Sequence, residues 1–123
     1  MPVFRLVAGM TRAQESDLTG MAHWGRLFGF IVVQVNRDGQ AIRYFGRTRF
    51  APFGDEGTME DPTVYSTLRG ANRRRAEMGE ILNQGGLDRG IYGMSHEEGT
   101  RIAVAIWVHP ESNFKPLEEY LGG

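Results

Sequence analysis

The chain has 123 residues, with 14 lysines and arginines against 15 aspartates and glutamates, and a formal net charge of −1 at pH 7. This length suits one domain with its own core, so we expect a single α+β domain over residues 1–123. The near-neutral charge excludes a global positive field for long nucleic acids. The lack of cysteine excludes disulfides, thiolate metal sites and cysteine nucleophiles. No apolar run approaches the roughly 20 residues that cross a bilayer, so we expect a cytoplasmic protein with no membrane role.

The first part of the chain predicts two strands and a hairpin. Residues 3–8 alternate weakly as in a short strand, and Thr11-Arg12-Ala13-Gln14 has the form of a capping box that opens a short helix. Residues 27–35 are apolar on both faces, which predicts a central strand covered on two sides. Residues 36–40 contain Asp38-Gly39, and glycine accepts positive φ at low cost, so a hairpin turn follows.

Residues 41–50 predict a second long strand with two different faces. Period-two alternation assigns one set to a core face: Ile42, Tyr44, Thr48 and Phe50. It assigns the other set to the opposite face: Arg43, Phe45, Arg47 and Arg49. The second face is suited to an anionic or aromatic partner.

The longest predicted element is a helix over residues 62–84. Asp61 is a good N-cap, Pro62 suits the first helical position, and Gly85-Gly86 ends the helix. The apolar stripe consists of Val64, Leu68, Ala71, Met78 and Leu82. Arg75 interrupts this stripe and should meet a carboxylate or a carbonyl if buried, unless its stem packs while the head reaches water. Gly70 and Gly79 lower helix stability, so we expect close backbone packing at one or both.

A second strand pair and a final helix complete the predicted order. Residues 87–94 and 100–109 are expected as strands joined by residues 95–99, and residues 113–121 as a short helix. This order predicts a two-layer α+β fold, with a mainly antiparallel sheet packed against the long helix. A split βαββαβ arrangement of ferredoxin-like type with an extra C-terminal helix is one topology that fits.

One predicted sheet face carries the candidate ligand-binding residues. If the long helix covers the face with Ile42, Ile102, Val104 and Ile106, the other face collects Arg43, Arg47, Arg49, Arg101, Trp107 and His109, together with Phe45. Such a face favours a non-enzymatic binding or adaptor domain that forms a homo-oligomer through it. The alternative is capture of an anionic small molecule such as a nucleotide, with guanidinium groups on phosphate and rings stacked on a base.

Two further clusters carry weaker signals. His96-Glu97-Glu98 and His109-Pro110-Glu111 place bases near carboxylates, which leaves a small acid–base enzyme as a third possibility. The acidic residues of the loop at 54–61 could hold a hard cation, although solvation explains them more simply, and no histidine spacing matches a zinc site. We expect no cofactor. The arginines at 69 and 73–75 could meet phosphates, but pairing with Glu77 and Glu80 is the simpler account.

Overall fold

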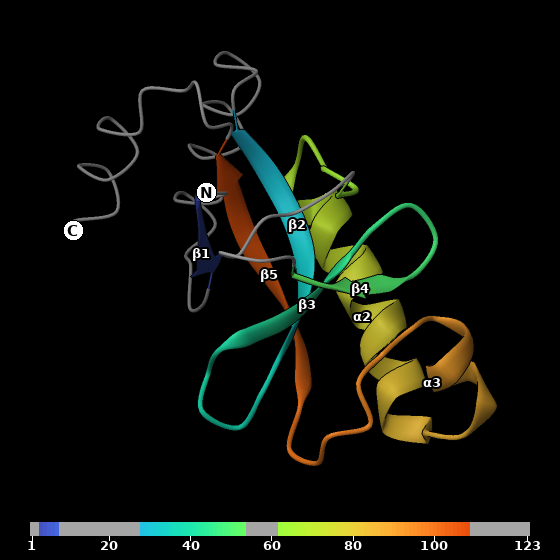
Figure 1. Cartoon of the computed structure of the whole chain (residues 1–123). Coiled ribbons are helices and arrows are strands. Elements are labelled where there is room, and N and C mark those ends of the chain that lie inside the picture. Colours follow the sequence, from blue (N-terminus) through green and yellow to red (C-terminus); the bar gives the residue numbers. More distant parts are fainter. Residues whose placement is uncertain (1–2, 8–27, 54–61, 109–123) are drawn as a thin grey trace.

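The computed structural model describes residues 3–7, 28–53 and 62–108, and the description below concerns these residues. Their strands form one antiparallel sheet in the order β1-β5-β2-β3-β4 (Figure 1). The strands are β1 (Val3–Val7), β2 (Phe28–Val35), β3 (Ala41–Phe45), β4 (Phe50–Pro52) and β5 (Arg101–Val108). Two helices, α2 (Leu68–Gln84) and α3 (Leu87–Ile91), lie between β4 and β5 in the chain. The α+β class with an antiparallel sheet is therefore confirmed.

The central strand is β2, as its apolar sequence predicts. It pairs with β5 along its whole length and with β3 near its end, and residues 30–35 are all buried. The predicted hairpin follows: the Asn36 side-chain oxygen accepts hydrogen bonds from the backbone of Asp38 at 3.0 Å and of Gln40 at 2.9 Å. Gly39 has φ +84°, the conformation for which glycine was expected there.

The single strand predicted over residues 41–50 is wrong in its second half. β3 ends at Phe45, the backbone N–H of Gly46 donates to the carbonyl of Arg49 at 2.8 Å, and β4 begins at Phe50. Phe45 and Phe50 are partners in the β3–β4 pairing, and their rings lie 5.3 Å apart. A tight reversal lets both rings enter one core, whereas a continuous strand would carry them far apart.

The long helix begins later than residue 62. Residues 62–65 are extended, and the backbone of Tyr65 exchanges hydrogen bonds of 2.8 and 2.9 Å with Phe30. This bridge pairs a part of β2 that β3 does not reach, which satisfies backbone groups that a helix there would leave open. Thr67 is the N-cap, and its hydroxyl accepts from the Gly70 N–H at 3.0 Å.

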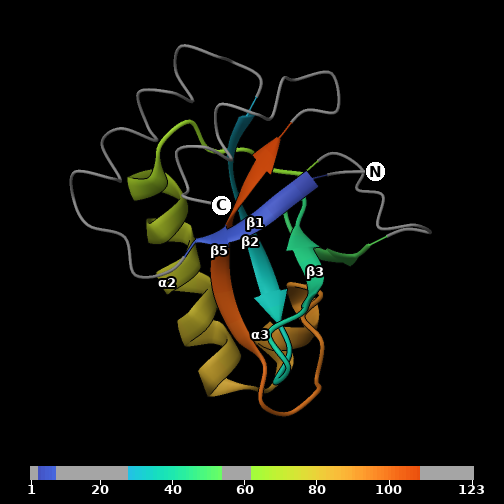
Figure 2. The ribbon, with the colours of Figure 1, turned by 90° about the vertical axis from the view of Figure 1, so that its left-hand side faces the viewer.

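α2 packs against one face of the sheet, where it contacts β5 and β2 (Figure 2). Leu68, Ala71, Met78 and Leu82 are buried, which confirms most of the predicted stripe, while Val64 is exposed. The core on this side joins helix and sheet residues: Val32, Phe45, Phe50, Met78, Leu82, Met94 and Ile102. Gly85, with φ +68°, ends the helix as predicted by donating to the Ile81 carbonyl.

The strand predicted over residues 87–94 is also wrong. The chain forms the short helix α3, and Gly93, with φ +71°, turns it back toward the sheet. Leu87 and Ile91 stand four residues apart, a helical spacing, but both are exposed, at 86% and 68%. The segment reaches the sheet through a backbone bond, from the N–H of Phe50 to the carbonyl of Tyr92 at 2.6 Å.

The sheet face turned away from α2 is buried as well. A second apolar cluster lies there and consists of Ile31, Val33, Val35, Tyr44, Ala103 and Ala105, with Ala41, Ala51, Phe53 and Trp107 packed against it. The predicted two-layer packing, which requires an open face, is not confirmed. The ferredoxin-like topology is not confirmed either, because its third strand pairs with the first, whereas β3 lies between β2 and β4. The helices predicted near residues 11 and 113–121 lie outside the described residues.

Gln34 is the one buried polar side chain among the described residues, and all its hydrogen bonds go to the segment before β5. Its amide nitrogen donates to the Ser95 carbonyl at 3.0 Å and to the Thr100 hydroxyl at 3.1 Å, and its oxygen accepts from the Ser95 N–H at 2.8 Å. Arg89 donates to the same Ser95 carbonyl at 2.7 and 3.0 Å. This network fixes residues 95–100 onto the end of the sheet.

Candidate anion-binding groove

The predicted Arg and aromatic surface is divided between the two sheet faces. Arg43 lies on the α2 side with the buried Phe45, and its Nη1 donates to the Gly93 carbonyl at 3.0 Å. Trp107 packs against the cluster on the other face, and Arg101 alternates in phase with it along β5. The arrangement that both the self-association and the sheet-face nucleotide hypotheses required is therefore not formed by these residues.

Of the remaining predicted site residues, Arg47 and Arg49 lie outside the strands, and Arg49 lies near Gly93, whose carbonyl binds Arg43. Arg47 and Arg49 are exposed in the reversal between β3 and β4, because the chain turns where a continuous strand was expected. Arg49 lies beside Gly93, where a Cβ would come within 3.0 Å of its Nε. His109 lies outside the described residues.

Most arginines of α2 have structural or solvated roles. Arg69 and Arg73 are exposed, and Arg74 forms an ion pair of 2.9 Å with Glu77, as predicted. Arg74 also donates to the Tyr65 hydroxyl at 3.2 Å, and its guanidinium lies 5.6 Å from the centre of the Phe45 ring. The Tyr65 hydrogen bond raises the pKa of Arg74, so this side chain is a fixed positive charge that closes the α2 side of the core.

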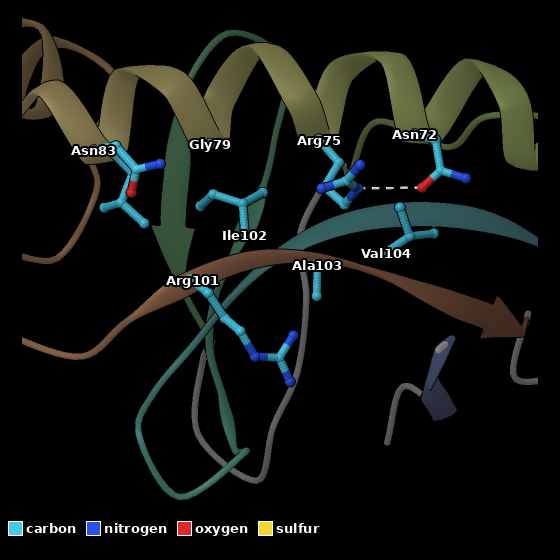
Figure 3. A pocket seen from close by; sticks show the side chains of 9 residues that line it. Asn72, Arg75, Gly79, Asn83, Arg101, Ile102, Ala103 and Val104 are labelled. Atoms are coloured by element: carbon cyan, nitrogen blue, oxygen red, sulfur yellow. Dashed lines mark hydrogen bonds between the residues drawn. The ribbon is translucent and has the colours of Figure 1, made fainter. Parts of the chain in front are cut away.

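Arg75, the residue that interrupts the apolar stripe, is different. It is half-buried between α2 and β5, and its Nε donates to the Asn72 side-chain oxygen at 3.2 Å (Figure 3). A carboxylate or carbonyl partner was expected only for a buried Arg75, and none occurs among the described residues; the partial exposure of Arg75 agrees with the alternative, in which the stem packs and the head reaches water. A guanidinium has five N–H donors, and a neutral amide oxygen uses one of them here. The remaining donors are available to an anion.

The guanidinium of Arg75 lies in a groove of about 420 Å³ between α2 and β5. The groove is lined by Asn72, Arg75, Gly79, Leu82, Asn83, Arg101, Ile102, Ala103 and Val104. Its volume falls within the roughly 300–1,000 Å³ typical of small-molecule sites. The lining combines two guanidinium and two amide side chains with an apolar floor, and none of the nine residues is acidic. This composition favours an anion over a cation.

The two arginines of the groove do not contribute equally. Figure 3 shows Arg75 and Asn72 directed from α2 toward β5, while the Arg101 side chain points away from α2, below β5. Arg101 is exposed, so its charge acts across solvent and is screened by salt. Direct contact with an anion in the groove therefore falls to Arg75, with Arg101 adding to the local positive field.

Gly79 lies in the wall of this groove. Close backbone packing was expected at Gly70, at Gly79 or at both. A Cβ at Gly79 would meet no atom within 4 Å, whereas a Cβ at Gly70 would lie 3.1 Å from the Thr67 hydroxyl. The predicted close packing therefore occurs at Gly70 and not at Gly79. Glycine inside a helix costs about 1 kcal/mol relative to alanine, and at Gly79 no backbone approach offsets that cost.

Sequence reasoning missed the two asparagines of the groove, although the signal was present. Asn72, Arg75, Gly79 and Asn83 are spaced three, four and four apart, which places them on one stripe of α2 beside the buried one. This stripe is polar, borders the apolar stripe and contains a glycine. Such a pattern indicates a helix face that lies beside the sheet but leaves space between the two. The sequence shows Arg75 and Gly79 as separate irregularities of the helix, and only the four-residue spacing along α2 places both on the face that borders the groove.

The acid–base and cation-site hypotheses find no support in the described residues. His96, Glu97 and Glu98 are all exposed; among the described residues, the Glu97 N–H donates to the Ser95 hydroxyl and the Glu97 carbonyl accepts from Arg89. His109, Glu111 and the acidic residues at 55–61 lie outside the described residues. Within 3–7, 28–53 and 62–108, no group of three histidines or acids is placed to hold a metal ion. No helix in these ranges is both long and apolar enough to cross a membrane.

Comparison with known proteins leaves the groove as the basis for a functional argument. No family model matches this chain, and no curated protein and no solved structure matches it either.

Proposed function

We propose that this protein binds a small anionic molecule in the groove between α2 and β5, with Arg75 holding a phosphate or carboxylate group. The observation that carries the proposal is the guanidinium of the partly buried Arg75, which has one neutral hydrogen-bond partner among the described residues and lies in a groove whose nine lining residues include no acid. A guanidinium in an open groove binds an oxyanion through charge-assisted hydrogen bonds, which are stronger than hydrogen bonds between neutral groups.

The contacts of Arg75 favour an oxyanion over a neutral ligand. The bond from its Nε to Asn72 fixes the plane of the guanidinium and leaves both terminal nitrogens for a forked contact. Asn72 can also donate from its amide nitrogen to the same ligand. Such a pre-oriented fork lowers the entropy lost on binding.

The test compares Arg75→Gln with Arg73→Gln, which removes the same charge from an exposed position of the same helix. Inorganic phosphate is titrated by heteronuclear NMR at constant ionic strength, with chloride as the exchanged anion. With a Kd on the order of 1 mM, 10 mM phosphate should stabilise the wild-type protein by about 1.4 kcal/mol and raise its Tm by about 4 °C. Arg75→Gln should abolish both the phosphate-induced NMR shifts and the rise in Tm, while Arg73→Gln should leave both unchanged.

The Arg101→Gln variant distinguishes direct contact between an arginine and the phosphate from long-range electrostatic attraction by an arginine that does not touch it. Because Arg101 is exposed and points away from α2, we expect its loss to weaken phosphate binding about twofold at low salt and not at all at 0.5 M salt. Equal phosphate binding by the wild-type and Arg75→Gln proteins, both shown to be folded, would refute the proposed function.

A further inference from the structure

The position of Gly79 bears on what kind of molecule the groove accepts. Glycine is among the least favourable residues in a helix interior, and Gly79 has neither a positive φ nor a close neighbour to require it. It does line the groove, between Arg75 and Asn83. The space that a side chain would occupy here is the middle of the groove, so glycine keeps this part open.

The groove is longer than an isolated anion needs. From Arg75 to Asn83 is eight residues, or about 12 Å along the helix axis at 1.5 Å per residue. A phosphate on Arg75 would fill one end of this length. The rest has an apolar floor from Leu82, Ile102 and Val104, and the Asn83 amide lies at the far end (Figure 3).

We infer that the ligand is a nucleoside monophosphate, whose phosphate binds Arg75, whose flat base lies across Gly79, and whose base edge meets Asn83. This inference rests on the proposed function and adds the class of the ligand. A planar ring fits an apolar floor opposite a helix surface without a side chain, because both sides of the ring are then in contact. An asparagine amide offers one donor and one acceptor side by side, which matches the edge of a nucleobase.

The groove variants for the test are Gly79→Ala and Gly79→Leu, and Gly90→Ala is the matched control. A Cβ at Gly90, in α3, also meets no atom within 4 Å, but this residue does not line the groove. Alanine and leucine are better helix formers than glycine, so all three variants should fold and the two at Gly79 should melt at a higher temperature. Weaker nucleotide binding by the two Gly79 variants, with binding by Gly90→Ala unchanged, then reflects a blocked groove.

Each protein is titrated by calorimetry with the 5′-monophosphates of adenosine, guanosine, cytidine and uridine, and with inorganic phosphate. The wild-type protein should bind at least one nucleotide 10-fold or more tighter than phosphate. Gly79→Leu should lose at least 10-fold in affinity for that nucleotide and Gly79→Ala about threefold, with phosphate affinity within twofold of wild type. Asn83→Ala should weaken the nucleotide about fivefold and leave phosphate unaffected.

The outcomes separate this inference from the proposed function. If phosphate binds through Arg75 but no nucleotide exceeds it, or if Gly79→Leu binds the nucleotide as well as Gly90→Ala does, the nucleotide inference is overturned and the anion site stands. If neither phosphate nor any nucleotide binds the wild-type protein, both are overturned.

Discussion

The Gln34→Glu substitution tests the buried polar network by exchanging one amide nitrogen for an oxygen. Gln34 has no solvent exposure, and its nitrogen donates to the Ser95 carbonyl and the Thr100 hydroxyl. A protonated carboxyl can still donate to Ser95 and accept from its N–H. An ionised carboxylate would instead face the Ser95 carbonyl oxygen in a buried position, which disfavours the charged form.

The expected size follows from this burial. Full burial raises a carboxyl pKa by up to 3–5 units, and the Arg89 guanidinium on the same carbonyl reduces the shift, so we expect about 2 units. At 1.36 kcal/mol per unit, the variant should lose about 3 kcal/mol at pH 7. The folded state binds the proton more tightly than the unfolded state, whose pKa is about 4.3. Stability is thus near wild type below about pH 4.3 and falls until about pH 6.5.

The assay is urea unfolding followed by circular dichroism between pH 4 and pH 7.5. Gln40→Glu serves as the control, because Gln40 is exposed in the hairpin and its side-chain oxygen, which accepts from Asn36 at 3.3 Å, remains after the change. This control should follow the wild-type pH profile within about 0.5 kcal/mol. A Gln34→Glu protein whose difference from wild type does not grow with pH would refute the buried network.

Two further predictions concern the packing of the helix and the turn before β5. Leu82→Ala should destabilise by about 2–4 kcal/mol in urea unfolding, because Leu82 is 6% exposed within the core between α2 and the sheet; a loss below 1 kcal/mol would contradict that packing. Gly93→Ala should destabilise by more than about 2 kcal/mol, since φ is +71° and the new Cβ would lie 2.4 Å from the Phe50 carbonyl oxygen. Gly99→Ala, where φ is +79° and the nearest contact is the flexible Arg37 side chain, should lose less and thus separates the clash from the backbone strain.

The proposed site explains why an arginine and a glycine stand on a helix face that could have been filled. Alanine at position 79 would improve the helix, and leucine at position 75 would continue its apolar stripe, yet the chain carries the two residues that keep a charged and open groove. Proteins commonly lose stability at the positions that serve binding. The groove accounts for both irregularities at once.

The sequence by itself determined the elements whose signals are local. Asn36-Arg37-Asp38-Gly39-Gln40 makes its own turn through the Asn36 side chain, and the spacing of Leu68, Ala71, Met78 and Leu82 fixes which face of α2 is buried. The apolar run at 27–35 predicts a strand covered on both sides, and β2, over Phe28–Val35, is that strand. These features depend on residues that are neighbours along the chain.

Only the tertiary structure decided what depends on distant partners. Alternation over residues 41–50 correctly grouped Arg43 with Phe45, but it could not show that α2 covers this face, nor that the chain reverses after Phe45 and brings the Phe45 and Phe50 rings to 5.3 Å. The partner of Gln34 lies 61 residues away at Ser95. The groove exists because α2 and β5, which are remote in sequence, meet beside Arg75 and Gly79 without filling the space between them. Side-chain periodicity fixes a face, but what that face meets is set by the packing of the whole fold.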